Sequence, residues 1–114
     1  MMKSFTLLAV LLFGVTASES SGAENGMASW YGPENSRSAT GKPLHHKVPA
    51  AAHKTLPIGT MVKITSVRTK KSVIAVIEDR GPYVRGRVVD VNRAAAKRLG
   101  IIKDGITKVT VEKI

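Results

Sequence analysis

Short runs of apolar residues, separated by turn-forming residues, recur along most of the chain. The segment MVKITSV (61–67) places Val62 and Ile64 on one face and polar residues on the other, which predicts a strand with one buried face. The segment SVIAVIE (72–78) is apolar almost throughout, which predicts a strand covered on both faces. The pattern therefore favours a chain rich in short strands.

Four more segments have strand character, and one has the marks of a helix. The strands are expected at 26–32, 48–53, 86–91 and 108–114, with turns at 55–60 and 68–71 and a polar loop at 33–47. The helix is expected between Asn92, a good N-cap, and Gly100, a good C-terminal stop, with Ala95, Ala96 and Leu99 on one face. These elements predict a mainly β fold, a closed six-stranded barrel with one short helix, because closure removes exposed sheet edges.

The first residues have the layout of a secretory signal peptide. Lys3 precedes an apolar stretch at about 5–15, and small residues follow it. That stretch is shorter than the roughly 20 apolar residues that span a bilayer. We expect cleavage after Ala23, or alternatively after Ala17, a mature domain of residues 24–114, and export to a periplasm or out of the cell.

The chain is strongly basic, with 18 Lys and Arg against 8 Asp and Glu, and it contains no cysteine. This charge predicts an anionic partner: a cell-wall polymer, a membrane surface or nucleic acid. Only one Trp, two Tyr and two Phe are present, and both Phe lie in the N-terminal segment. The interleaving of basic and aromatic residues typical of single-strand binders is missing, so nucleic acid is not expected. Without cysteine, neither a disulfide nor a lipid anchor is expected.

Four blocks in order along the chain carry a family resemblance: GMASWYG, AAHKTLPIGTMVKIT, EDRGPYVRGRVVDVNRAAAKRLG and the closing VTVE. They resemble the rare lipoprotein A (RlpA-like) family of septal endolytic peptidoglycan transglycosylases, over about residues 26–114. The resemblance implies a double-psi β-barrel, a fold shared with expansins and some endoglucanases. It also implies a lyase that cleaves the MurNAc–GlcNAc bond to 1,6-anhydro-MurNAc ends in cell-wall remodelling and septation. Strands without stem peptides would be preferred.

The sequence departs from the family pattern in two ways. Family members often carry a lipid-attachment cysteine and a C-terminal peptidoglycan-binding repeat domain, and neither is seen here. The family motif of the first loop is roughly Thr-Ala-Asn/Ser-Gly-Glu, whereas this chain has SATGK, so Lys42 occupies the acidic position. The main alternative is therefore a non-catalytic, expansin-like domain that binds glycan or loosens the wall. A module that recruits cell-division partners is a third interpretation, and we expect a monomer.

Asp79 is the first candidate for catalysis. One carboxyl group can protonate the glycosidic oxygen and then accept the proton of the C6 hydroxyl that attacks C1, so a lytic transglycosylase does not need the second carboxyl of ordinary glycosidases. The position after the apolar VIAVI run suits an acid that must carry a proton near neutral pH. Alternatively, Asp79 only caps the turn at 80–82. Adjacent strand side chains face opposite ways, so Glu78 is expected to be a solvated flank.

His53 and Asp90 are the next candidates. His53 matches the functional histidine of the family and is expected to hydrogen-bond Asp79 or the substrate, although a satisfied structural histidine is the alternative. Asp90 is expected to line the sugar groove and to be the reserve acid. The alternatives for Asp90 are an ion pair with Arg87, three residues before it, and capping of the following helix.

The remaining candidates would bind substrate. With Asp90, they are Trp30, Tyr31, Lys42, Arg80 and Tyr83. Alternation sends one ring of the Trp30–Tyr31 pair into the core and leaves the other to stack on a sugar. Lys42 would hold an anionic saccharide group or be solvated, and the nearby His45 and His46 are further candidates for proton transfer. The histidines lack metal-ligand spacing, so neither a metal nor another cofactor is expected.

Overall fold

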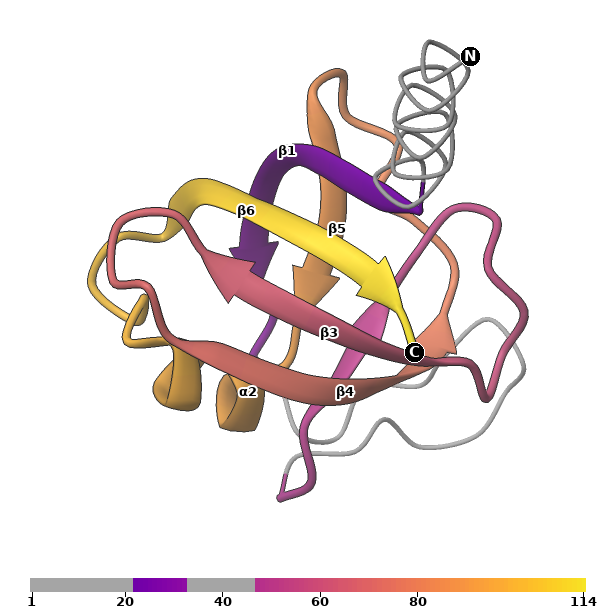
Figure 1. Cartoon of the computed structure of the whole chain (residues 1–114), viewed down its shortest axis with the longest axis horizontal. Coiled ribbons are helices and arrows are strands. Elements are labelled where there is room, and N and C mark those ends of the chain that lie inside the picture. The colour runs from indigo at the N-terminus through magenta and orange to yellow at the C-terminus, as the bar shows by residue number, and fades with distance from the viewer. Residues whose placement is uncertain (1–21, 33–46) are drawn as a thin grey trace, which may run out of the picture.

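The computed structural model describes residues 22–32 and 47–114. Within these ranges the chain forms β1 (Ala23–Trp30), β2 (Ala50–Ala52), β3 (Met61–Ser66), β4 (Ser72–Asp79), β5 (Arg87–Val91), α2 (Arg93–Leu99) and β6 (Ile106–Lys113). The strands close into a barrel in the order β1–β5–β2–β4–β3–β6 (Figure 1). The prediction of a mainly β, closed six-stranded barrel with one short helix is confirmed.

The barrel contains both parallel and antiparallel pairs of neighbouring strands. β1 runs parallel to β5, and β2 runs parallel to β4, whereas the other neighbouring pairs are antiparallel. Parallel neighbours cannot be joined by a tight hairpin, so they come from distant parts of the chain. The three-residue β2 joins the two parallel pairs, since Ala52 lies opposite Asp79 of β4 on one side and opposite Asp90 of β5 on the other.

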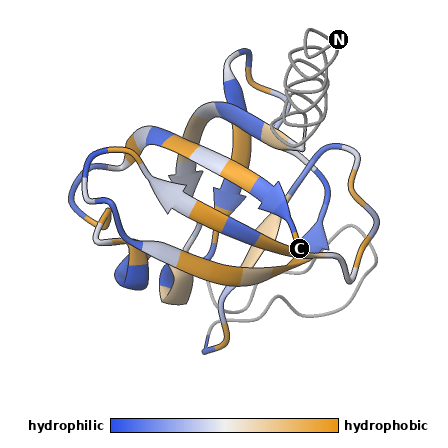
Figure 2. Cartoon of the chain, in the orientation of Figure 1, coloured by the Kyte–Doolittle hydropathy of each residue, from blue (hydrophilic) through white to orange (hydrophobic). Residues whose placement is uncertain are grey.

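The barrel interior is filled by branched aliphatic side chains and alanines. Alternate residues of β3 point inward, so Val62 and Ile64 are fully buried while Lys63 is exposed. Hydrophobic and hydrophilic residues alternate along β3 and β6 in the same way (Figure 2). The alternation that predicted these strands therefore indicates which side chains face the core.

The expectation that segment 72–78 is covered on both faces is wrong for most of β4. Ile74 is 44% exposed, and Val76 is only partly buried, whereas Val73, Ala75 and Ile77 form part of the core. The outer wall of a barrel faces solvent unless another element covers it. Only at the end of β4 are consecutive residues buried, and the candidate site lies there.

Helix α2 is capped as predicted and is also tied to β2. The Asn92 side-chain oxygen accepts the N–H of Ala95 at 3.0 Å and the N–H of Ala50 at 3.1 Å. Its amide nitrogen donates to the carbonyl of Val48 at 2.7 Å. At the other end, Gly100 adopts the left-handed conformation (φ 74°) that a C-terminal cap requires. One buried amide thus fixes both the start of the helix and the approach to β2.

The predicted signal peptide falls almost entirely on residues 1–21, which lie outside the described residues. The predicted cut after Ala23 falls at the first residue of β1. In the described part of the chain, no helix has the length and apolar character needed to cross a membrane.

Candidate active site

Two aspartates flank the end of β2. Ala52 pairs with Asp79 of β4 on one side and with Asp90 of β5 on the other, and Asp90 also pairs with Ser29 of β1. Asp79 and Asp90 are therefore separated by two strand spacings, roughly 10 Å between strand axes. The barrel topology brings together two candidates that are 11 residues apart in sequence and places a β1 residue beside them.

An irregularity in β4 lies at the site. The β2–β4 register runs from Ala51 opposite Ile77 to Ala52 opposite Asp79, so the register skips Glu78, the extra residue of β4. Such a β-bulge interrupts strict alternation and re-aims the side chains beside it. Alternation along β4 consequently does not predict the directions in which the carboxyl groups of Glu78 and Asp79 point.

The expectation that Glu78 is a solvated flank is wrong. Its side chain is buried, with 8% of the residue exposed, and its Oε2 accepts the hydroxyl of Tyr31 at 2.5 Å. Burial, and then the hydrogen bond and charge of Glu78, raise the pKa of the Tyr31 phenol, with smaller contributions from Asp79 and Asp90. The Tyr31 hydroxyl therefore stays protonated and lies within electrostatic reach of three carboxyl groups.

Asp90 is held by two partners. Its Oδ1 accepts the hydroxyl of Ser29 at 2.8 Å and pairs with Nε of Arg87 at 2.9 Å. The predicted alternative of an ion pair with Arg87 is thus confirmed. Both side chains of the pair are about one-fifth exposed, so Asp90 remains accessible to a ligand at the rim.

Both ring nitrogens of His53 have partners. The backbone N–H groups of Thr55 and Leu56 donate to Nδ1 at 3.2 and 3.1 Å. Because Nδ1 accepts these bonds, the ring hydrogen lies on Nε2, which donates to Oε1 of Glu24 at 2.8 Å. His53 contacts Asp79 through the backbone, where its N–H donates to the Asp79 carbonyl at 3.0 Å. Hydrogen bonds at both nitrogens therefore hold the His53 ring in place beside the site.

Arg80 joins the same two segments. Its backbone N–H donates to Oδ1 of Asp79 at 2.8 Å, which is the turn-capping contact that sequence reasoning offered as an alternative. Its guanidinium Nη1 donates to the carbonyl of His53 at 2.7 Å. The turn after β4 and the loop after β2 are thus fastened together beside the Asp79 carboxyl.

The aromatic candidates have different surroundings. Trp30 packs against the core, and its indole N–H donates to the carbonyl of Ile102 at 3.2 Å. Tyr31 is half-buried among the carboxyl groups, and Tyr83 is 75% exposed on the turn after β4. Of the neighbouring pair, Trp30 is therefore the core residue and Tyr31 the site residue. Lys42, His45 and His46 lie outside the described residues.

Three site residues were missed by sequence reasoning: Glu24, Ser29 and Glu78. Each is recognised only through a contact with a residue at least 29 positions away. The sequence shows the acidic pair Glu78 and Asp79, but it does not reveal the β-bulge that separates their surroundings. Within the described ranges, no group of three or more His, Asp or Glu side chains is arranged to hold a metal ion.

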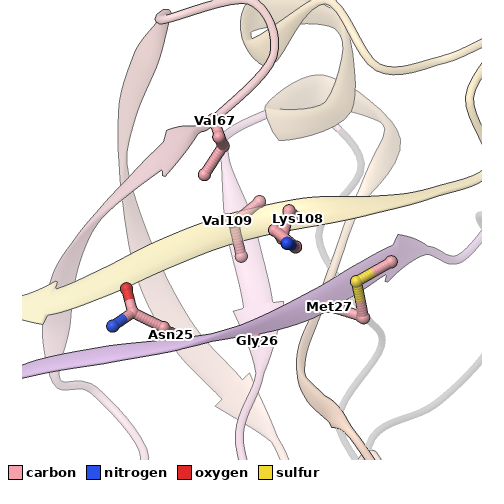
Figure 3. A pocket seen from close by; sticks show the side chains of 6 residues that line it. All are labelled: Asn25, Gly26, Met27, Val67, Lys108 and Val109. Atoms are coloured by element: carbon pink, nitrogen blue, oxygen red, sulfur yellow. The ribbon is translucent and has the colours of Figure 1, made fainter.

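A hollow of about 460 Å³ lies elsewhere on the barrel (Figure 3). It is lined by Asn25, Gly26, Met27, Val67, Lys108 and Val109. None of these residues belongs to the carboxylate cluster. The chemistry of the carboxylate cluster, rather than the size of this hollow, therefore identifies the candidate site.

The closed barrel with its carboxylate cluster at one rim defines a double-psi β-barrel with a candidate acid/base site. Residues 23–111 match the family model described as lytic transglycolase, and the chain belongs to that family. It is 43% identical over 91 residues to a probable endolytic peptidoglycan transglycosylase RlpA of Synechocystis, covering 78% of this chain and 28% of that protein. It is 42% identical over 102 residues to the endolytic peptidoglycan transglycosylase RlpA of Pasteurella multocida, covering 87% of this chain and 35% of that protein. The chain thus spans about a third of the length of these relatives.

Solved structures support the fold. The Streptomyces papain inhibitor superposes with a TM-score of 0.64 at 18% identity, covering 81% of this chain and 94% of the inhibitor. A mutant Clavibacter michiganensis expansin in complex with cellohexaose superposes with a TM-score of 0.66 at 15% identity, covering 81% of this chain and 50% of the expansin. At such low identity these similarities establish the architecture alone.

Proposed function

We propose that this domain is a lytic transglycosylase that cleaves the MurNAc–GlcNAc bond of peptidoglycan without using water. Its family membership and the names of its relatives support this class of reaction. The observation that carries the residue assignment is the position of Asp79, half-buried at the end of β4 among Arg80, Tyr31 and a second carboxyl group. Asp79 is the acid and then the base.

The proposed reaction balances with one carboxyl group. Protonated Asp79 gives its proton to the glycosidic oxygen as the bond from that oxygen to C1 of MurNAc breaks. The C6 hydroxyl of the same MurNAc then attacks C1, and the Asp79 carboxylate accepts the hydroxyl proton. The products are a GlcNAc with a free 4-hydroxyl and a 1,6-anhydro-MurNAc end, and Asp79 is again protonated.

The surrounding residues position this chemistry. His53 and Arg80 hold the two segments that carry the Asp79 backbone, so we assign them to positioning rather than to proton transfer. Asp90, oriented by Ser29 and Arg87, would bind sugar hydroxyls in the next part of the groove. Tyr83, exposed on the turn after Asp79, would stack on a sugar ring.

The biological setting belongs to the same proposal. The substrate is the glycan strand without stem peptides, and the protein is exported by its N-terminal signal and acts as a monomer during septation, near cell-division partners. The strong basic charge supports an anionic polymer as substrate, because removal of the stem peptide at its amide bond frees a lactyl carboxylate on each MurNAc.

A non-catalytic glycan-binding domain is the second candidate. Lys42 at the position where the family has an acid supports it, as does the contact by which the Asp79 carboxyl caps its own turn. On this interpretation the groove binds glycan strands, but no covalent bond is broken.

Replacement of Asp79 tests the proposal directly. Asp79→Asn is expected to lower the rate of 1,6-anhydro-MurNAc formation from stem-free strands by about 100-fold or more, since general acid–base catalysis contributes on that order. Products are identified and counted by mass spectrometry. The matched control is Glu112→Gln, which removes an exposed carboxylate on β6 and should leave the rate unchanged. Glycan binding without any anhydro product from the unmodified protein would favour the non-catalytic candidate.

A further inference from the structure

The hydrogen bond between Tyr31 and Glu78 joins opposite sides of the site. Tyr31 follows β1 and Glu78 lies near the end of β4, and the barrel order places β5 and β2 between those strands. Three strand spacings around the wall amount to roughly 14 Å. The bond therefore bridges the barrel rim beside Ala52, the residue that Asp79 and Asp90 flank.

The bulge explains how Glu78 can take part in this bridge while Asp79 stays opposite Ala52 at the end of β2. The β2–β4 register skips Glu78, and the Glu78 side chain is directed to Tyr31 rather than to solvent. The next residue, Asp79, returns to register opposite Ala52. The β-bulge thus gives two adjacent carboxyl groups different surroundings.

The direction of the hydrogen bond is fixed by the phenol. Burial and the neighbouring carboxyl groups raise the pKa of Tyr31, so its hydroxyl keeps its hydrogen and donates it to Glu78. A short hydrogen bond to a buried carboxyl holds the phenol in one place. The Tyr31 ring is thereby held beside the carboxylate cluster, within electrostatic reach of Asp79.

We propose that Glu78 is a positioning residue that acts through Tyr31: the pair, which we call the rim latch, fixes the Tyr31 ring as the wall against which the sugar undergoing cleavage is held toward Asp79. This inference rests on the proposed function for its kinetic consequence. The rim latch itself is a property of the contacts in the fold. Misplacing a reacting group by a fraction of an ångström slows chemistry more than it weakens binding, so the latch should affect kcat more than KM.

Three variants test the rim latch against a purely structural role. Glu78→Ala and Tyr31→Phe each remove the hydrogen bond, and both are expected to lower kcat for anhydro-end formation by about tenfold or more while KM changes less than about threefold. Glu78→Gln keeps an acceptor for the Tyr31 hydroxyl and should restore kcat to within about threefold of the unmodified protein. Glu112→Ala, which removes an exposed carboxylate on the outer wall, is the control and should change neither constant.

A spectroscopic measurement tests the latch independently of turnover. The chain has two tyrosines, Tyr31 and the exposed Tyr83, so phenolate absorbance during alkaline titration reports on both. Tyr31→Phe identifies the Tyr31 contribution. In Glu78→Ala, loss of the acceptor and of its charge should let Tyr31 ionise at lower pH, over the range where circular dichroism shows an intact fold.

The possible results separate the two proposals. If Glu78→Ala and Tyr31→Phe have unmodified kcat, or if Tyr31 titrates identically with and without Glu78, the rim latch is refuted. If Glu78→Ala loses kcat but Glu78→Gln does not recover it, the hydrogen bond is not what Glu78 contributes, and the proposal is also refuted. If the unmodified protein forms no anhydro ends, the proposed function fails. The titration, together with the affinity of each variant for stem-free strands, still decides for or against the latch.

Discussion

At the residue scale, the site depends on side chains whose partners are remote in sequence. Glu78 and Asp79 are adjacent, yet one is buried against Tyr31 and the other lies at the rim. The difference comes from a single extra residue in one strand, which changes the direction of the side chains around it. The position of the register shift thus determines which of the two carboxyl groups is buried and which is partly exposed.

The buried Tyr31 phenol predicts a loss of stability at alkaline pH. Its pKa in the folded protein is raised, so above pH about 10, the ordinary value for tyrosine, the unfolded chain releases this proton and the folded protein retains it. The unfolded state then binds fewer protons, and the free energy of unfolding falls as pH rises. Below about pH 10 the effect is absent.

Urea unfolding between about pH 8 and about pH 11 measures this dependence. Tyr31→Phe should show a smaller decline in stability with pH than the unmodified protein. Tyr83→Phe, at the exposed tyrosine, should follow the unmodified protein. Identical slopes for the two variants would contradict the assignment.

At the element scale, helix α2 is held by one side chain that also holds the entry to β2. Asn92 caps the helix, donates to Val48 and accepts from Ala50, and it is 1% exposed. The helix has only seven residues, so its own backbone gives it little independent stability. The buried amide therefore connects formation of α2 to formation of the β2 segment.

Asn92→Ala is expected to lower the free energy of unfolding by about 2–4 kcal/mol. It removes a helix cap and leaves the Val48 carbonyl and the Ala50 N–H without that partner. Thermal and urea unfolding measure the change. Asn25→Ala, at an exposed position of β1, is the matched control and should cost less than about 0.5 kcal/mol.

At the scale of the whole molecule, charge is unevenly distributed. Among the described residues, Glu24, Glu78, Asp79 and Asp90 are connected to the site, and Asp104 is paired with Arg68. Glu112 is then the remaining described acid, on the outer wall. The other charged side chains among the described residues are those of Lys and Arg, so an anionic glycan would be attracted to this part of the molecule and meet carboxyl groups mainly at the candidate site.

This distribution predicts salt-dependent binding of glycan strands. Raising NaCl from about 20 to about 200 mM should weaken the affinity for stem-free strands that carry lactyl carboxylates, because salt screens the attraction between exposed charges. Uncharged chitin oligosaccharides should bind with nearly the same affinity at both salt concentrations. Calorimetry measures both ligands, and equal salt dependence for the two would argue against electrostatic attraction.

The sequence determined the elements of this protein and its candidate acid. Alternation in segment 61–67, the caps at Asn92 and Gly100, and the apolar run before Asp79 each depend on neighbours within a few residues, and the structure places strand, helix and strand end accordingly. These features are local, so physical chemistry along the chain is sufficient to predict them.

Only the tertiary structure decided how those elements make a site. It placed Asp79 and Asp90 on either side of Ala52, and it turned Glu78 toward Tyr31, a residue 47 positions away. The tertiary structure also supplied hydrogen-bond partners for both ring nitrogens of His53. Such contacts depend on barrel closure, strand order and a bulge, and these are set by the packing of the whole chain rather than by any short segment of it.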